Sequence, residues 1–219
     1  MGASLTVERA GQPVQLLAER ALFWPARRWL LIADLHLGKG EALRRGGIAV
    51  PRGGTREDLQ RLHLLVEQTG AVALHVLGDF LHGASEGAWR EDWHAWRAQH
   101  ATLAISIVAG NHDRRLARNA EAWEVALHPE GESHGPFEFR HMPRETAAHV
   151  IAGHVHPRVH YPGLPGRWPA FLLWPHMTIL PAFSLFTGGA NALPGTGAHA
   201  IACLDGLVAA LPLEQSRRR

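Results

Sequence analysis

The sequence predicts an α/β fold with a β-rich second half. Three observations predict this class. Short, nearly continuous apolar runs recur along the chain, helical patterns separate the earlier runs, and strand-like segments dominate after about residue 100. Apolar runs of this length are typical of strands buried on both faces. With 46% hydrophobic residues in 219, we expect residues 1–213 to form one domain with its own core, followed by a frayed basic tail at 214–219.

Each of four apolar runs stops where polar side chains begin. The runs lie in "WLLIADLHLG", "VALHVLGDFLHG", "LAISIVAGNHD" and "AAHVIAGHVHP". The polar residues that follow them are Asp34 and His36, Asp79, Asn111 to Asp113, and His154 and His156. Because open α/β sheets place their sites at the carboxyl ends of strands, we expect these side chains to meet.

The spacing of these residues suggests metal ligands. Asp34 and His36 are two apart, so on an extended strand both would point to the same face, and His154 and His156 repeat that spacing. Gly78 before Asp79 permits a tight turn. Carboxylate and imidazole groups suit Zn²⁺, Mn²⁺ or Fe. Each motif alone is as well explained by a polar turn, but the ordered combination favours a metal site.

Two helices are expected between the first three runs. In "TREDLQRLHLLVEQTG", Thr55 is the expected N-cap, Leu59, Leu62 and Val66 form an apolar stripe, and Gly70 ends the helix. In "EGAWREDWHAWRAQH", three tryptophans recur at helical spacing, which predicts core packing. These tryptophans are Trp89, Trp93 and Trp96.

The second half contains mainly strand patterns. They occur in "WEVALHP", "FEFRHMP", "HVIAGHVHP", "FLLWPHMTILPAF" and "AHAIACLDGLVAAL". Prolines between residues 157 and 181 predict loops and edge strands there.

We expect a soluble cytoplasmic protein. Cys203 is the single cysteine, so no disulfide can form within the chain, and its place in an apolar run makes it a poor nucleophile. The first residues, "MGASLTVERAG", lack the apolar core of a signal peptide, and no apolar run is long enough to span a bilayer. The net charge of +2 is too small to identify a nucleic-acid-binding protein by itself.

Four motifs follow one another between Asp34 and His156, in the order D-x-H, G-D, G-N-H-D and G-H-x-H. This set resembles the motifs of the calcineurin-like metallophosphoesterase superfamily. The resemblance implies a four-layer αββα sandwich that carries two metal ions. The stretches "RRGGIAVPRGG", "GDFLHG", "RHMP" and "LPAFSLFTGG" resemble one bacterial branch, the ligase-associated DNA damage response endonucleases of PdeM type. That branch implies a DNA substrate and repair ligase, helicase or exonuclease partners.

The resemblance also implies a set of ligands. One ion would be held by Asp34, His36 and His156, the other by Asn111, His141 and His154, and Asp79 would bridge the two. His141 in "FRHMP" occupies no tight motif, and His128 in "LHPEGE" is its competitor. We expect two divalent ions, with Mn²⁺ favoured and Fe, Zn or Ni possible.

The remaining residues of the third motif have other implied roles. His112 would stay free of metal and protonate the leaving group, and Asp113 would orient it. Two divalent ions carry more positive charge than Asp34 and Asp79 neutralise, which favours an anionic phosphate ester.

Basic side chains and one further histidine near the motifs are candidate substrate contacts, although some are expected to be solvated surface charges. They are Lys39, Arg44, Arg45, Arg52, Arg56, His82, Arg114, Arg115 and Arg118.

The sequence thus predicts a dinuclear phosphodiesterase, with a repair endonuclease favoured. One alternative is an enzyme acting on small or cyclic phosphate esters. The other is a non-catalytic metal-binding scaffold, which the complete set of motif residues disfavours.

Overall fold

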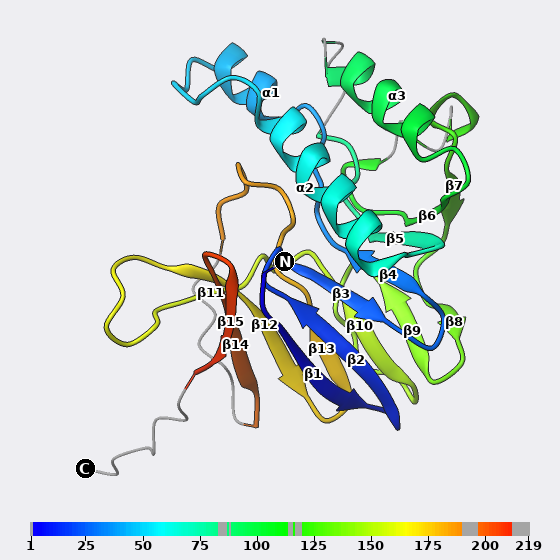
Figure 1. The fold of residues 1–219 in the computed structure, drawn as a ribbon, viewed down its shortest axis with the longest axis vertical. Coiled ribbons are helices and arrows are strands. Elements are labelled where there is room, and N and C mark those ends of the chain that lie inside the picture. The colour runs from blue at the N-terminus through cyan, green and yellow to red at the C-terminus, as the bar shows by residue number, and fades with distance from the viewer. Residues whose placement is uncertain are drawn as a thin grey trace.

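The computed structural model describes residues 2–82, 87, 89–113, 116, 120–189 and 197–211. Two β-sheets pack against each other, with helices beside the first sheet (Figure 1). The predicted α/β class is confirmed. The expected tail at 214–219 lies outside the described residues. No helix in the described ranges has both the length and the hydrophobicity needed to cross a membrane.

The first sheet follows the order of the chain, β1 to β7. Its first four strands are antiparallel, and β4 to β7 run parallel. The strands are β1 (Ser4–Arg9), β2 (Gln12–Leu17), β3 (Ala21–Trp24), β4 (Trp29–Ile32), β5 (Ala73–Leu77), β6 (Ala104–Val108) and β7 (Ala126–His128). The sequence patterns did not predict β1 to β3, which precede the first αβ unit.

The second sheet has the order β15-β14-β12-β13-β10-β9-β8, with β11 paired to β12. Only the pairs of β10 with β9 and with β13 are parallel. The strands are β8 (Glu132–His134), β9 (Phe137–Arg140), β10 (His149–Ala152), β11 (Arg158–Val159), β12 (Trp168–Trp174), β13 (Met177–Ile179), β14 (His199–Leu204) and β15 (Leu207–Ala210). The expected β-rich second half is therefore present.

The described helices are α1 (Lys39–Arg45), α2 (Gly54–Thr69), α3 (Trp89–Gln99) and the 3-10 turn η2 (Ala120–Trp123). Thr55 was wrongly predicted as the N-cap of α2. The cap is Gly53, whose φ of 88° is left-handed, and no side chain caps the helix. The Thr55 hydroxyl instead accepts a hydrogen bond from the Gly38 amide at 3.3 Å, which joins α2 to the loop before α1. Gly70 ends α2 as predicted.

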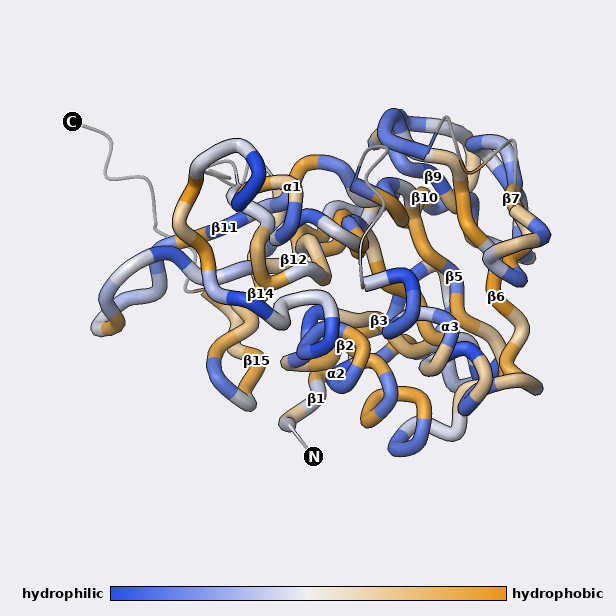
Figure 2. The backbone as a smooth tube through the Cα atoms, turned by 90° about the horizontal axis from the view of Figure 1, so that it is seen from above, coloured by the Kyte–Doolittle hydropathy of each residue, from blue (hydrophilic) through white to orange (hydrophobic). Residues whose placement is uncertain are grey.

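Two apolar cores lie on the two faces of the first sheet. One packs the stripe of α2 and the three tryptophans of α3 against β4 and β5, so the predicted core role of those tryptophans is confirmed. The other lies between the sheets and includes Leu31, Phe137, Ile151 and Phe171. Hydrophobic colour follows the inner strands, as β5 and β6 show in Figure 2.

The outer face of the second sheet carries a third apolar cluster, from β12, β13 and β14. Partly buried loop residues, among them Val155 and Tyr161, pack on it. No helix among the described residues covers this face, so three of the four expected layers are described here.

His75 of β5 is buried at the sheet interface against the rings of Trp29, His134 and Phe139. Burial, aided by His134 and His128, lowers the pKa of His75 to about 3. Below a pH of about 6.5, His75 therefore binds a proton in the unfolded chain but not in the folded chain. As a result, the free energy of unfolding falls as the pH falls.

The free energy of unfolding of the wild type falls between pH 7 and pH 5. We expect this fall to be smaller by about 2 kcal/mol in the His75→Leu variant. Urea unfolding at both pH values measures this difference. The matched control is His176→Leu, because His176 is exposed in the turn between β12 and β13. An unchanged pH dependence in His75→Leu would show that the buried ring is not the source.

Candidate metal centre

Three loops that follow inner strands meet at one edge of the sheets. Asp34, Asp79 and His154 lie just beyond β4, β5 and β10. The His36 amide donates to the Asp79 carbonyl at 2.8 Å, and the His154 amide donates to Asp34 Oδ2 at 2.9 Å. The first bond joins the loops after β4 and β5 within the first sheet, and the second bond joins the two sheets at the site. Both involve groups at carboxyl strand ends, as expected.

The expected extended geometry of the D-x-H and H-x-H pairs is wrong. Asp34 and His36 have φ of 55° and 48°, and His154 and His156 have φ of 68° and 49°. Asp79 is also left-handed, at 48°. Non-glycine residues rarely adopt such φ values, and they collect at functional sites because the surrounding structure holds them there. The side chains converge through these turns rather than through strand alternation.

Two glycines permit the close approach of these loops. A Cβ on Gly78, which has φ of 79°, would lie 2.0 Å from Nδ1 of His141. A Cβ on Gly153 would lie 2.7 Å from that of Ala33 and 2.8 Å from the Leu77 carbonyl oxygen. The glycines of the G-D and G-H-x-H motifs are thus required by packing.

Asp34, His36 and His156 form one group of three ligand atoms that all lie within 4.8 Å of one another. Nε2 of His156 is 3.2 Å from Oδ1 of Asp34. Among the described residues, Asp34 Oδ1, His36 Nε2 and His156 Nε2 are buried atoms without a hydrogen-bond partner. Burial lowers the pKa of His36 far below its ordinary value, so its imidazole is neutral and can donate a lone pair.

Asp79, His141 and His154 form a second group within the same limit. Nε2 of His141 is 3.0 Å from both His154 Nδ1 and Asn111 Oδ1. Asp79 faces both groups, because Oδ1 is 3.7 Å from His141 Nε2 and Oδ2 is 3.8 Å from His36 Nε2. The Asp79 carboxylate therefore lies between the two groups.

The two histidines that competed for the isolated ligand position lie in different surroundings. His141 is 1% exposed and lies in the second group. Its Nδ1 is 3.2 Å from the Leu77 carbonyl oxygen, an orientation that leaves Nε2 facing the site. His128 instead pairs through Nδ1 with Glu132 at 3.1 Å.

His112 borders the second group but does not belong to it. Its side chain is 40% exposed, and Nε2 lies 3.9 Å from Oδ2 of Asp79. Its ring stacks on that of His82, with centroids 5.2 Å apart.

His82 lies beside His36, with their Nδ1 atoms 3.4 Å apart. Burial, aided by Lys39 and His112, lowers the pKa of His82 to about 4. His82 is therefore neutral near pH 7, and its Nδ1 lies within hydrogen-bonding distance of His36.

The described contacts of Asp113 differ from those expected. Its buried carboxylate accepts hydrogen bonds from the amides of Gly110, Phe80 and Leu81, at 2.9, 3.3 and 3.0 Å. These bonds hold the loops after β5 and β6 together. Asp113 thus supports the loop that carries His112 rather than bonding to its imidazole.

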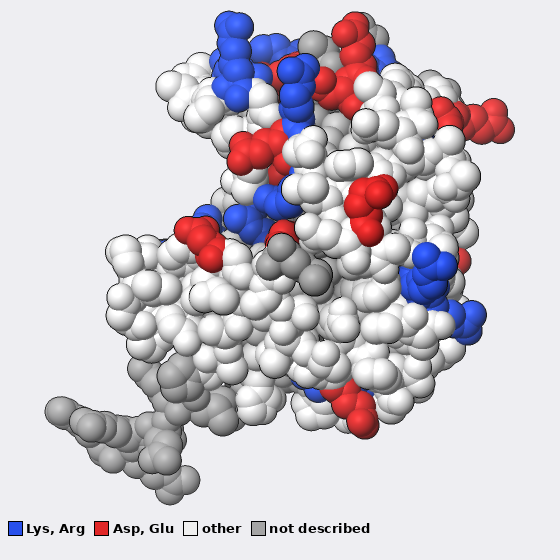
Figure 3. Space-filling view, in the orientation of Figure 1, with Lys and Arg blue, Asp and Glu red and all other residues white. Residues whose placement is uncertain are grey.

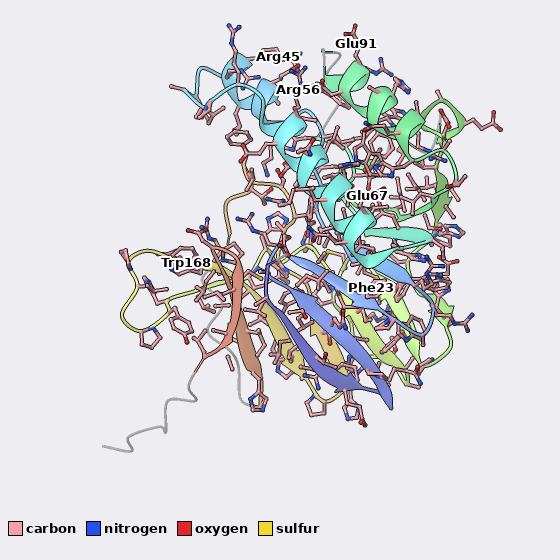
Figure 4. The ribbon with its side chains drawn as sticks, viewed as in Figure 1. Phe23, Arg45, Arg56, Glu67, Glu91 and Trp168 are labelled. Carbon is pink, nitrogen blue, oxygen red and sulfur yellow. The ribbon has the colours of Figure 1, made fainter. Side chains whose placement is uncertain are left out.

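The candidate substrate residues lie in different surroundings. Lys39 is half-buried, its Nζ is 3.5 Å from the Thr187 hydroxyl, and Asp34 and Asp79 partly offset the burial that lowers the pKa of Lys39. Arg45 is exposed on α1 (Figure 4). Arg114, Arg115 and Arg118 lie outside the described residues.

An open groove of about 530 Å³ begins directly after the first motif. It lies between α1 and the starts of α2 and α3, and Trp89 forms part of its wall. Its charged lining is Glu41, Arg44, Arg52, Arg56 and Asp92. Figure 3 shows a hollow between the helices and the sheets, with basic side chains in and above it.

Sequence reasoning missed two arginines beside the first group. Arg20, Arg158 and Thr187 line a small cavity together with His156. Arg20 belongs to the turn after β2 and Arg158 begins β11, so neither lies in a motif. Burial, with Arg61 nearby, lowers the pKa of Arg20 to about 10, and the guanidinium remains charged at neutral pH. No local signal in the sequence marks these positions.

A model of the calcineurin-like phosphoesterases matches residues 27–140. The chain belongs to this family of metallophosphoesterases. Pseudomonas putida nuclease MPE, of which a crystal structure is known, is 34% identical, with a TM-score of 0.84 over 95% of this chain and 100% of that one. AQ665 from Aquifex aeolicus, a protein of unknown function, is 18% identical, with a TM-score of 0.40 over 58% of this chain and 78% of that one. No curated protein matches the chain.

The residues present fit the divalent metals that the family binds. In the first group, three buried polar atoms without hydrogen-bond partners face one another. Burying such atoms costs free energy, and a bound cation would offset that cost. The donors are oxygen and imidazole nitrogen without thiolate, a set that suits Mn, Fe or Zn.

Proposed function

We propose that the protein is a dinuclear-metal-dependent phosphodiesterase that cleaves nucleic acid. The observation that carries this proposal is the pair of ligand groups joined by Asp79, with the unligated His112 beside them. The nuclease that is 34% identical to this chain supports nucleic acid as the substrate.

Asp34, His36 and His156 would hold one ion, and Asn111, His141 and His154 the other. When bound, such ions supply hydroxide near neutral pH and neutralise charge on the phosphate. Asn111 is a neutral ligand, so the site keeps more positive charge than an aspartate there would leave. His112 protonates the leaving oxygen, since its exposed ring is free of both groups.

Basic groups on two sides of the site would bind a phosphate chain. Lys39 and Arg158 lie near the ligand groups, and Arg44, Arg52 and Arg56 line the groove beyond α1. Arg56 is paired with Asp92 at 2.8 Å, so a phosphate would have to compete with that carboxylate. The groove has three arginines and two acidic residues, so its net charge is positive. A positive groove favours the binding of a polyanion.

The test compares a phosphodiester, a phosphomonoester and single-stranded DNA as substrates, with Mn²⁺ and after chelation. We expect cleavage of the diester and of DNA that chelation abolishes and Mn²⁺ restores. Monoester-only activity would support the alternative of a phosphatase. Inactivity with Mn²⁺, Fe²⁺, Zn²⁺ and Ni²⁺ would support a metal-binding scaffold.

The double change Arg52→Ala and Arg56→Ala is expected to weaken DNA binding about uniformly across sequences. It should reduce the slope of log affinity against log salt by about 1 for each lost phosphate contact. Hydrolysis of a small diester should not change, because it does not reach the groove. Binding titrations at several salt concentrations measure the slope.

Arg9→Ala is the control, because the β1–β2 turn lies at the end of the molecule opposite α1 (Figure 1). If the slope of log affinity against log salt did not change in the double variant, the groove would not be part of the DNA-binding surface. The place in DNA repair, with ligase, helicase or exonuclease partners, rests on the resemblance of the secondary motifs alone.

A further inference from the structure

A third group of ligand-type side chains lies away from the candidate centre, where α2 meets the end of α3. It consists of His63, Glu67 and His100, whose ligand atoms all lie within 4.8 Å of one another. His63 and Glu67 are four residues apart on α2 and so share one helix face. His100 directly follows α3. Glu67 is labelled on α2 in Figure 4.

The geometry is close to that of a tetrahedral zinc site. Nδ1 of His63 is 3.0 Å from Nε2 of His100. Zinc–nitrogen bonds of about 2.0–2.1 Å at tetrahedral angles place two ligand nitrogens roughly 3.3 Å apart. The two imidazoles thus need to separate by only a few tenths of an ångström, and a carboxylate that can complete the set is already within reach.

Burial and charge also suit a cation. His100 is buried, His63 is half-buried and Glu67 is exposed, so the site has a buried inner side and an outer side open to water. Burial and the neighbouring His63 lower the pKa of His100, which keeps a lone pair available. Glu67 supplies negative charge. Arg97, the nearby positive group, lies 3.7 Å from Glu124, which offsets its charge.

We propose that His63, Glu67 and His100 bind a third, structural transition-metal ion, with Zn²⁺ as the fitting metal and water as its fourth ligand. The ion joins α2 to α3, the two helices that cover the first sheet. Two imidazoles and one carboxylate are an established donor set for zinc. The site is independent of the proposed phosphodiesterase activity.

Zinc titration of the chelator-stripped full chain tests this site, with bound ions counted and Tm recorded. Glu67→Gln is the principal variant, because Glu67 is exposed and the change keeps its shape. His63→Ala is the second, and His94→Ala is the control, because His94 is an exposed histidine on α3. Both ligand variants should bind one ion fewer per chain than the wild type and the control.

Ligand variants should also lose part of the zinc-induced rise in Tm, roughly 5–10 °C with zinc at about 100 times its Kd. Zinc at the candidate active centre raises Tm in all four proteins, so the difference between them isolates the third site. Their Mn²⁺-dependent activity should stay at the wild-type level. Equal ion counts and equal Tm shifts in all four proteins would overturn the proposal and leave His63 and His100 as a hydrogen-bonded pair between helices.

Discussion

Asp79→Asn is expected to lower metal-dependent diester hydrolysis roughly 10³-fold. The Asp79 carboxylate faces both ligand groups, with Oδ1 toward His141 and Oδ2 toward His36. Losing its charge weakens both ion sites, and a loss of about 4 kcal/mol in transition-state stabilisation corresponds to this factor. Initial rates at saturating Mn²⁺ and the metal content of the purified variant measure the effect.

The matched control is Asp205→Asn, because Asp205 is exposed in the turn between β14 and β15. It makes the same chemical change away from the site and should retain wild-type rates. If Asp79→Asn kept both its ions and its rate, Asp79 would not be the bridge. Far-ultraviolet circular dichroism separates loss of metal from loss of fold, since the Asp79 carboxylate also accepts the His112 amide at 3.0 Å.

His112→Asn is expected to lower the rate about 10²–10⁴-fold while the chain keeps its metals. The imidazole is exposed and belongs to neither ligand group, so its removal takes away a proton donor and no ligand. The loss should be largest for DNA, whose leaving alkoxide needs a proton. It should be much smaller for a diester whose leaving group is stable as an anion.

This dependence on the leaving group distinguishes protonation from substrate binding. An equal loss for both substrates would assign His112 to binding, and loss of metal would make it a ligand. His94→Asn is the control, because it replaces an exposed histidine on α3. Because the rings of His112 and His82 are stacked, the effect of replacing His82 should be compared with that of replacing His112. His82→Ala should weaken metal binding through His36 rather than change the leaving-group dependence.

The class of fold and the meeting of the motif residues at one edge of the sheets could be predicted from sequence, because both depend on local patterns. Apolar runs that end in Asp34, Asp79, Asn111 and His154 indicated the strand ends that the structure brings together. The mode of convergence could not be predicted. Left-handed φ values at Asp34 and other non-glycine positions are imposed by tertiary contacts, which propensities do not encode.

Other features were missed because their signal is not local. The strands β1 to β3 come from segments with no motif, and their pairing becomes clear only beside β4. Arg20 reaches the neighbourhood of His156 through a turn far away in the chain. Thr55 has the residue type of an N-cap, but Gly53 occupies that position because the backbone there is left-handed. Asp113 bonds to backbone amides of two loops, a role that its motif does not indicate.

Anomalous diffraction from crystals soaked in Mn²⁺ tests the central claim most directly. We expect two manganese peaks, one among Asp34, His36 and His156 and the other among Asn111, His141 and His154, with Asp79 in contact with both. A single peak, peaks elsewhere, or no peak under conditions in which Mn²⁺ supports hydrolysis would contradict a dinuclear centre built from these residues.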